Sequence, residues 1–169
     1  AADWLTPATR RLRVTAPRVA THWKPGQFVI IRADGEGERI PLTIADSDAA
    51  TGTITLIIQS VGKSTTDLVA LQPGEATTDV AGPLGSPTEL VESGHAVCVG
   101  GGVGTAVILP IAQELARRRV RVTSIIGGRS REWVILEPEL AACSHVIACT
   151  DDGSYGRPGF VTQALEDVL

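Results

Sequence analysis

The sequence predicts a small antiparallel β-barrel followed by a parallel α/β half, and three observations carry this prediction. In the first 80 or so positions, short apolar runs alternate with Pro/Gly turns, which is typical of small barrels and sandwiches. From position 96 onward, strand-like runs alternate with helix-like runs, which indicates a parallel sheet covered by helices. Between them, residues 82–94 are rich in Gly, Pro and Ser. We therefore expect two domains, residues 1–90 and 91–169.

The expected strands of the first half are short and lie between turn residues. Residues 11–15 alternate polar and apolar side chains, which is the period of a half-buried strand. Each later run follows a turn that contains glycine. These runs are residues 28–31, 40–45, 53–61 and a short one that ends near Val80.

Residues 62–64 (Gly-Lys-Ser) mark the start of an expected helix and a candidate anion site. The helix should cover residues 64–71, with Ser64 or Thr65 as its cap. The motif resembles the end of a P-loop, but a P-loop needs a glycine where Ile57 stands. Backbone N–H groups and hydroxyls could still bind an anion here. An ordinary helix cap is the simpler interpretation.

The second half repeats a strand and a helix three times. Its first helix carries apolar side chains on one face and ends in three arginines, which suit the negative end of the helix dipole. This order predicts a parallel sheet with helices on its faces. We expect strands at 96–99, 121–126 and 146–150, and helices at 105–118, 131–140 (around Pro138) and 160–169.

A run of glycines between the first of these strands and its helix is the strongest local signal. Residues 100–105 read Gly-Gly-Gly-Val-Gly-Thr. A phosphate could approach this backbone without meeting a Cβ, and the helix start offers free N–H groups at the positive end of its dipole. The strict fingerprint G-x-G-x-x-G is not met, because position 105 is Thr. A tight strand-to-helix turn without a ligand is the alternative.

Two further turns follow the second and third strands of this half. Arg129 and Arg131 come after the second strand, whose end lies over the adenosine ribose in doubly wound folds, and arginines there favour a 2′-phosphate. A solvated basic turn is the alternative. Residues 151–156 (Asp-Asp-Gly-Ser-Tyr-Gly) follow the third strand, at the sheet edge where ligands bind. An ordinary Asp/Gly turn is the alternative there.

Composition excludes several functional classes. With 15 basic and 19 acidic residues the net charge is −4, so neither nucleic acid nor an anionic membrane is expected as the main partner. The mainly apolar, uncharged stretch over residues 96–112 is shorter than the roughly 20 residues of a membrane span. Three cysteines without CxxC spacing indicate a reducing compartment, most simply the cytoplasm. No nucleophile–base pair stands out, so a cofactor would supply any enzymatic chemistry.

Six motifs, taken in order, resemble the ferredoxin–NADP reductase superfamily. They are residues 24–28, 41–45, 61–65, 82–85, 100–105 and 150–156. Together they resemble the small flavin subunit of NADH-dependent ferredoxin–NADP oxidoreductase (also described as sulfide dehydrogenase) and the related electron-transfer subunit of dihydroorotate dehydrogenase. The resemblance covers nearly the whole chain. It implies FAD on the barrel and NAD or NADP on a nucleotide-binding α/β half.

The resemblance also implies the cofactor-binding residues. The superfamily holds FAD with an Arg-x-aromatic-Ser/Thr strand; here Ile40 stands at the arginine position, and Arg39 would act in its place. The FAD side comprises Arg39, Pro41, Leu42, Thr43, Gly62, Lys63, Ser64 and Thr65. The NAD(P) pyrophosphate site comprises Gly100, Gly101, Gly102, Val103, Gly104 and Thr105, with Arg129 on the adenosine side and Asp151, Asp152 and Gly153 facing the nicotinamide and flavin. No residue is given a catalytic role, and no metal ligand is expected in this chain.

Members of this family continue into a cysteine-rich tail whose four thiolates ligate a [2Fe–2S] cluster. Three cysteines are too few for such a cluster, and the α/β half has too few strands to be complete. We therefore expect the chain to be part of a longer protein, with the cluster only in the full-length form. The implied partner is a larger flavin/iron–sulfur oxidoreductase subunit. Tyr155 is one of the few aromatic side chains that could cover the flavin.

The function implied is that of a FAD-dependent NAD(P)H oxidoreductase that serves as an electron-transfer subunit. It would pass hydride between NAD(P)H and FAD, and single electrons to or from iron–sulfur centres of the partner. Two alternatives stay open: a nucleotide-binding module without turnover, acting as a sensor or structural subunit, and a stand-alone flavin-dependent NAD(P)H reductase. The sequence leaves NAD against NADP undecided.

Overall fold

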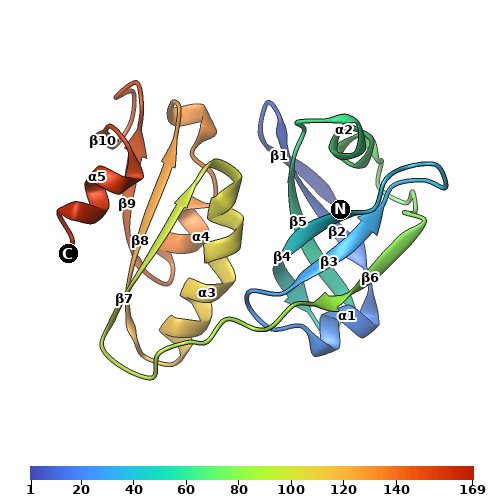
Figure 1. Cartoon of the computed structure of the whole chain (residues 1–169), viewed down its shortest axis with the longest axis horizontal. Coiled ribbons are helices and arrows are strands. Elements are labelled where there is room, and N and C mark those ends of the chain that lie inside the picture. Colours follow the sequence, from blue (N-terminus) through green and yellow to red (C-terminus); the bar gives the residue numbers. More distant parts are fainter. The chain divides into compact units, whose positions relative to one another are not determined.

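The computed structural model describes residues 1–169 and divides them into two compact units, Ala1–Thr88 and Glu89–Leu169. The first unit is built of antiparallel strands and the second of parallel strands with helices (Figure 1). This is the fold class that the sequence predicts. No helix is long and apolar enough to cross a membrane.

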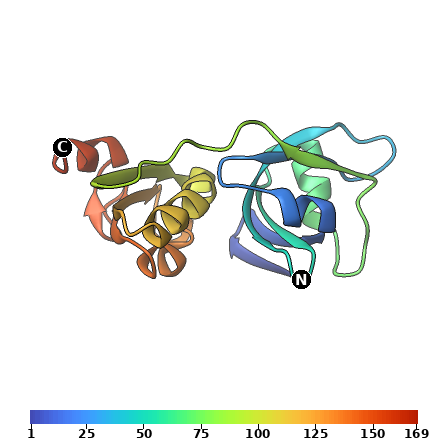
Figure 2. The ribbon, with the colours of Figure 1, turned by 90° about the horizontal axis from the view of Figure 1, so that it is seen from below.

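A six-stranded antiparallel sheet forms the first unit, and it curls into a barrel-like shape (Figure 2). Its side chains alternate between an inner and an outer face, and the inner ones form an aliphatic core that includes the fully buried Val29, Ile31, Ile44 and Leu56. The strands, in spatial order, are β1 (Ala2–Thr6), β2 (Thr9–Thr15), β5 (Thr53–Gln59), β4 (Ile40–Asp48), β3 (Phe28–Arg32) and β6 (Asp79–Leu84).

Two helices complete this unit, α1 (Pro17–His22) and α2 (Lys63–Ala70). Neither β1 nor α1 was predicted from the sequence. The cap predicted for α2, Ser64 or Thr65, was wrong. Gly62 is the N-cap, and Thr65 is the third helical residue. The Thr65 hydroxyl accepts hydrogen bonds from the N–H groups of Val61 and Gly62, each at 3.0 Å. It thereby fixes the first turn from inside the helix.

The second unit is a four-stranded parallel sheet with helices on both faces (Figure 1). Helix α3 packs on β7 and β8, and α5 packs on the other face, where Ala164 joins a small cluster with Ile125 and Cys149. The strands, in spatial order, are β10 (Arg157–Pro158), β9 (His145–Thr150), β8 (Arg121–Gly128) and β7 (His95–Gly101). The helices are α3 (Thr105–Arg117), α4 (Glu137–Ala141) and α5 (Val161–Glu166), with short 3-10 turns η1 (Gly102–Gly104) and η2 (Arg131–Trp133).

The helix expected over residues 131–140 is wrong, because the chain there forms two short pieces, η2 and α4. Ile135 and Leu136 between them are both buried at 4% exposure. Leu136 has φ +60°, which an α-helix does not allow. Pro138 then stands in the first turn of α4, where proline is tolerated. The predicted last helix is also shorter than expected, and the two-residue strand β10 was not predicted.

Candidate functional site

The first part of the candidate site is the outer face of β3, β4 and β6. Antiparallel pairing sets Phe28 opposite Thr43, and Ile30 opposite both Pro41 and Ala81. Since neighbouring residues of a strand point to opposite faces, these side chains lie outside the core. Pro41 and Ala81 are exposed, and the other three are half-buried. The result is an apolar strip on the barrel surface with one hydroxyl, that of Thr43.

Leu42, between Pro41 and Thr43, lies on the other face of β4. It packs against the core together with Ile40. A ligand on the outer face would therefore meet the backbone of Leu42 rather than its side chain. The structure brings Pro41 and Thr43 together as predicted site residues and turns Leu42 inward.

A charged cluster borders this strip. Asp79, the first residue of β6, is paired with Arg32 at the end of β3. Its Oδ2 accepts hydrogen bonds from Arg39 Nη2 at 2.6 Å and from Arg32 Nη2 at 3.2 Å. Arg39 immediately precedes β4, so the carboxylate reaches across β3 to hold it. The sequence pointed to Arg39, but gave no sign of its partners.

The second part of the site is a cavity of about 460 Å³ at the start of α2. One wall is Val61–Thr65, which includes the predicted residues Gly62, Lys63, Ser64 and Thr65; the other is formed by Glu36, Gly37, Glu38 and Ile40. Arg39 is not part of this lining, which contains the residue on each side of it. The Ser64 hydroxyl donates to Glu38 Oε2 at 3.5 Å and so links the two walls.

This cavity has features that fit a phosphate-bearing ligand. The first N–H groups of a helix have no partner within the helix, and α2 offers them at the cavity. A Cβ on Gly62 would meet nothing within 4 Å, so the backbone is open to approach. Lys63 is engaged elsewhere: its Nζ lies 2.8 Å from Asp67, whose hydrogen bond raises the lysine pKa. The carboxylates of Glu36 and Glu38 can accept hydrogen bonds from hydroxyl groups, such as those of a ribose, whereas they would repel a phosphate.

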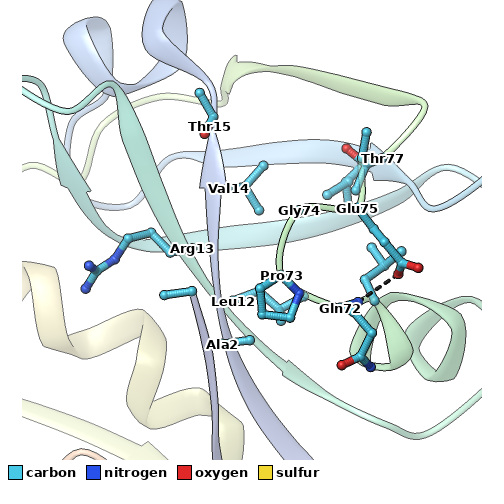
Figure 3. Close-up of a pocket in the computed structure, with 14 residues that line it drawn as sticks. Ala2, Leu12, Arg13, Val14, Thr15, Gln72, Pro73, Gly74, Glu75 and Thr77 are labelled. Atoms are coloured by element: carbon cyan, nitrogen blue, oxygen red, sulfur yellow. Dashed lines mark hydrogen bonds between the residues drawn. The ribbon is translucent and has the colours of Figure 1, made fainter.

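Another cavity of this unit, about 420 Å³, lies elsewhere on the barrel (Figure 3). Its walls come from β1, β2 and the turn after α2, including Leu12, Val14 and Pro73. A hydrogen bond of 2.7 Å from the N–H of Gln72 to Glu75 closes that turn. None of the site residues predicted from the sequence lines this cavity.

In the second unit, the glycine run forms the turn between β7 and α3. A Cβ on Gly100 would lie 3.0 Å from Gly104 O and from the backbone of Thr105, so the close packing of strand against helix requires this glycine. A Cβ on Gly101, Gly102 or Gly104 would meet nothing within 4 Å. The buried Thr105 hydroxyl donates to Gly100 O at 3.3 Å. Packing explains Gly100 and a φ of +53° explains Gly102, whereas Gly101 and Gly104 leave backbone open to a ligand without either requirement.

The two other predicted turns are joined to each other at the carboxyl ends of β8 and β9. The N–H groups of Asp151 and Asp152 donate to Gly128 O at 3.1 Å and to Arg129 O at 3.2 Å. The Asp152 side chain caps its own turn, and the Ser154 hydroxyl and N–H lower the Asp152 pKa. β8 lies between β9 and β7, so the acidic turn (Asp151, Asp152, Gly153) adjoins Arg129 and is separated by a strand from the glycine run.

Aromatic side chains hold both arginines of this region, an arrangement the sequence did not predict. Arg129 stacks over the Trp133 ring and Arg131 over the Tyr155 ring, each 4.6 Å from the ring centre. The Tyr155 hydroxyl donates to Glu137 Oε1 at 2.9 Å, and this carboxylate raises the tyrosine pKa. Tyr155, which the sequence offered as a cover for the flavin, is thus committed to Arg131 and Glu137.

The three cysteines are free thiols, and burial raises the pKa of each, which makes them poor nucleophiles. No group of three or more His, Cys, Asp or Glu side chains is close enough together to hold a metal ion.

Comparisons with known proteins identify relatives over nearly the whole chain, although no protein-family model matches it. The chain is 40% identical over 156 residues to a homologue of the dihydroorotate dehydrogenase B (NAD(+)) electron transfer subunit in Thermotoga maritima, covering 92% of this chain and 55% of that protein. It is 37% identical over 164 residues to the electron transfer subunit of Bacillus caldolyticus dihydroorotate dehydrogenase B (NAD(+)), covering 94% of this chain and 63% of that protein. The chain therefore spans little more than half the length of these relatives.

Solved structures agree with this relationship. A chain of the NADH-dependent reduced ferredoxin–NADP oxidoreductase, described in connection with flavin-based electron bifurcation, superposes with a TM-score of 0.95 at 34% identity, covering 99% of this chain and 61% of that one. The ferredoxin reductase of carbazole 1,9a-dioxygenase superposes with a TM-score of 0.82 at 21% identity over 100% of this chain and 55% of that one, which shows a common fold. The homologues of this chain thus include electron-transfer subunits of dihydroorotate dehydrogenase B, and its structure matches that of NADH-dependent reduced ferredoxin–NADP oxidoreductase and shares the ferredoxin reductase fold.

Proposed function

We propose that this chain is the flavin- and nicotinamide-binding part of an electron-transfer subunit that couples NAD(P)H to the iron–sulfur centres of a larger oxidoreductase partner. The observation that carries the proposal is the turn between β7 and α3. Gly101 and Gly104 leave its backbone open although neither packing nor a positive φ requires glycine there. In a parallel α/β sheet that is where a dinucleotide pyrophosphate binds.

The first unit would bind FAD. The apolar strip around Ile30, Pro41 and Thr43 suits a flat ring, and the N–H groups at the start of α2 suit a phosphate. Arg39 supplies a cation at the border of the strip. The curated relatives include electron-transfer subunits and a homologue of one, which supports a redox cofactor on this chain.

The second unit would bind NAD(P)H across the carboxyl ends of its strands. Residues 100–105 would hold the pyrophosphate, with Arg129 on the adenosine side. Because the acidic turn of Asp151 and Asp152 is hydrogen-bonded to the Arg129 turn, we assign that turn to the adenosine side as well, instead of the nicotinamide side. Charge alone does not favour NADP over NAD, because the two arginines of this region (Arg129 and Arg131) lie beside two aspartates (Asp151 and Asp152).

FAD, when bound, accepts a hydride from NAD(P)H and releases electrons one at a time, which is the chemistry an iron–sulfur partner needs. The protein's own residues bind and orient. Backbone N–H groups of α2 and of the β7–α3 turn hold phosphates, and the outer face of the barrel fixes the plane of the ring. No side chain is required as a general acid or base.

Oxidation of NADH or NADPH with a soluble one-electron acceptor tests this proposal. FAD-reconstituted chain should turn over, and Arg129→Ala should raise KM for the preferred nucleotide about tenfold with kcat nearly unchanged, because it removes ground-state binding. Arg121→Ala is the matched control: it removes an exposed arginine from the amino end of the same strand. Nucleotide binding without turnover would favour a sensor or structural module over the proposed enzyme.

A further inference from the structure

The cluster of Asp79 with Arg32 and Arg39 is poorly suited to a purely stabilising role. The Arg39 side chain is 60% exposed and that of Asp79 is 40% exposed. Exposed ion pairs of this kind contribute little to folding, because water screens them and two side chains must be ordered. One carboxylate shared by two guanidinium groups leaves a net positive charge. The cluster therefore presents a cationic edge to the apolar strip.

The contacts within the cluster hold the Arg39 side chain in one position. Asp79 is fixed at the start of β6 by its pairing with Arg32 on β3. Its Oδ2 reaches Arg39, on the far side of β3, through a single nitrogen, Nη2, at 2.6 Å. The rest of the guanidinium fork of Arg39 is not used by this contact. A planar fork with free N–H donors is the group that binds a phosphate most effectively.

We propose that Asp79 is a positioning residue that holds Arg39 ready for a phosphate group of FAD, an inference that rests on the function proposed above. An arginine on an exposed loop must lose its rotamer freedom when it binds a ligand. The contact with Asp79 removes that freedom beforehand, and Arg32 prevents the carboxylate from cancelling the charge of Arg39.

Asp79→Asn distinguishes positioning of Arg39 from a purely electrostatic effect, because the two predict opposite changes in FAD affinity. Removal of a negative charge beside an anion site should tighten FAD binding if charge alone matters. If Asp79 acts by holding Arg39, binding should weaken, and we expect the dissociation constant of FAD to rise about tenfold. FAD affinity is measured by titration of the flavin-free chain, with the melting temperature recorded in parallel to confirm folding.

A double-mutant cycle identifies the residue through which Asp79 acts. Asp79→Asn should have no further effect on FAD affinity in an Arg39→Gln background. Asp79→Glu, which keeps the charge and an acceptor oxygen, should restore most of the affinity. Glu114→Gln is the matched control, because Glu114 also binds two arginines, Arg117 and Arg118, but in the other unit. This control should leave FAD affinity unchanged.

The outcomes are distinct. Unchanged or tighter FAD binding by Asp79→Asn, or a loss that persists in the Arg39→Gln background, would overturn the positioning role alone. A wild-type chain that binds no FAD would overturn the proposed function and this role together.

Discussion

Arg10 shows how a single residue can support the fold in a way that strand periodicity does not reveal. It lies on β2 and is only 7% exposed. Its guanidinium donates to Val69 O and, at 3.0 Å, to Leu71 O, and stacks over the Trp4 ring. These carbonyls belong to the end of α2, where the helix itself supplies no donor. Arg10 therefore fastens the C-terminal end of α2 to the barrel.

Arg10→Ala is expected to lower the free energy of unfolding by about 2–4 kcal/mol, because it leaves buried carbonyls without donors and removes packing against Trp4. Urea denaturation measures the change. Arg13→Ala removes an exposed arginine from the same strand and should stay within about 0.5 kcal/mol of wild type. Equal effects of the two substitutions would show that the Arg10 contacts contribute nothing.

Glu114 makes the stability depend on pH. Hydrogen bonds from Arg117 and then Arg118 lower its pKa from 4.5 to about 2. A carboxylate whose pKa is lowered in the folded state stabilises the protein above its unfolded pKa and loses that contribution as pH falls through its folded pKa. Glu114→Gln should therefore cost up to about 1 kcal/mol near neutral pH, a small figure because the pairs face water. The difference between wild type and variant in unfolding free energy should shrink as the pH is lowered from 5 to 2; a difference that stays constant over this range would contradict the assignment.

At the scale of elements, two adjacent glycines in the turn between β7 and α3 have different expected roles: Gly100 allows close packing, and Gly101 leaves the backbone open to a ligand. Gly100→Ala places a Cβ 3.0 Å from Gly104 O and the Thr105 backbone, and should destabilise the second unit by about 1–3 kcal/mol. Gly101→Ala meets nothing within 4 Å, and the φ of −103° at Gly101 is allowed for alanine. It should leave stability within about 0.5 kcal/mol of wild type but weaken NAD(P)H binding about tenfold or more.

Thermal melting and nucleotide titration of the two variants make this comparison. If Gly101→Ala binds NADH and NADPH as tightly as wild type does, no ligand approaches this backbone, and the turn serves packing alone.

The sequence predicted the elements whose signals are local. Strands β2 to β5, helix α3 and the glycine turn follow from periodicity and glycine placement. The helix over 131–140 failed because the burial of Ile135 and Leu136 outweighs their helical propensity.

The side-chain contacts of the candidate site were out of reach for a different reason. Arg39 meets Asp79 across 40 positions, and Arg131 meets Tyr155 across 24. Only the sheet register brings such pairs together. The sequence could therefore name Arg39 and Arg131 as candidates, but it could not name their partners Asp79 and Tyr155 as such.

At the scale of the whole molecule, two units of different architecture each expose the backbone at the start of a helix, and we propose that a phosphate binds at each of these two places. One lies at the start of α2 on the barrel, and the other lies between β7 and α3. Relatives with similar sequence over nearly the whole chain include electron-transfer subunits. The central claim is therefore that FAD on the first unit is reduced by NAD(P)H bound to the second.

Anaerobic addition of NADH or NADPH to the chain loaded with FAD tests this claim most directly. The account predicts a yellow protein with about one FAD per chain, whose flavin absorbance is bleached by at least one of the two nucleotides, and more slowly at limiting nucleotide in Gly101→Ala. A chain that takes up no FAD, or whose bound flavin stays oxidised with either nucleotide in excess, would contradict it.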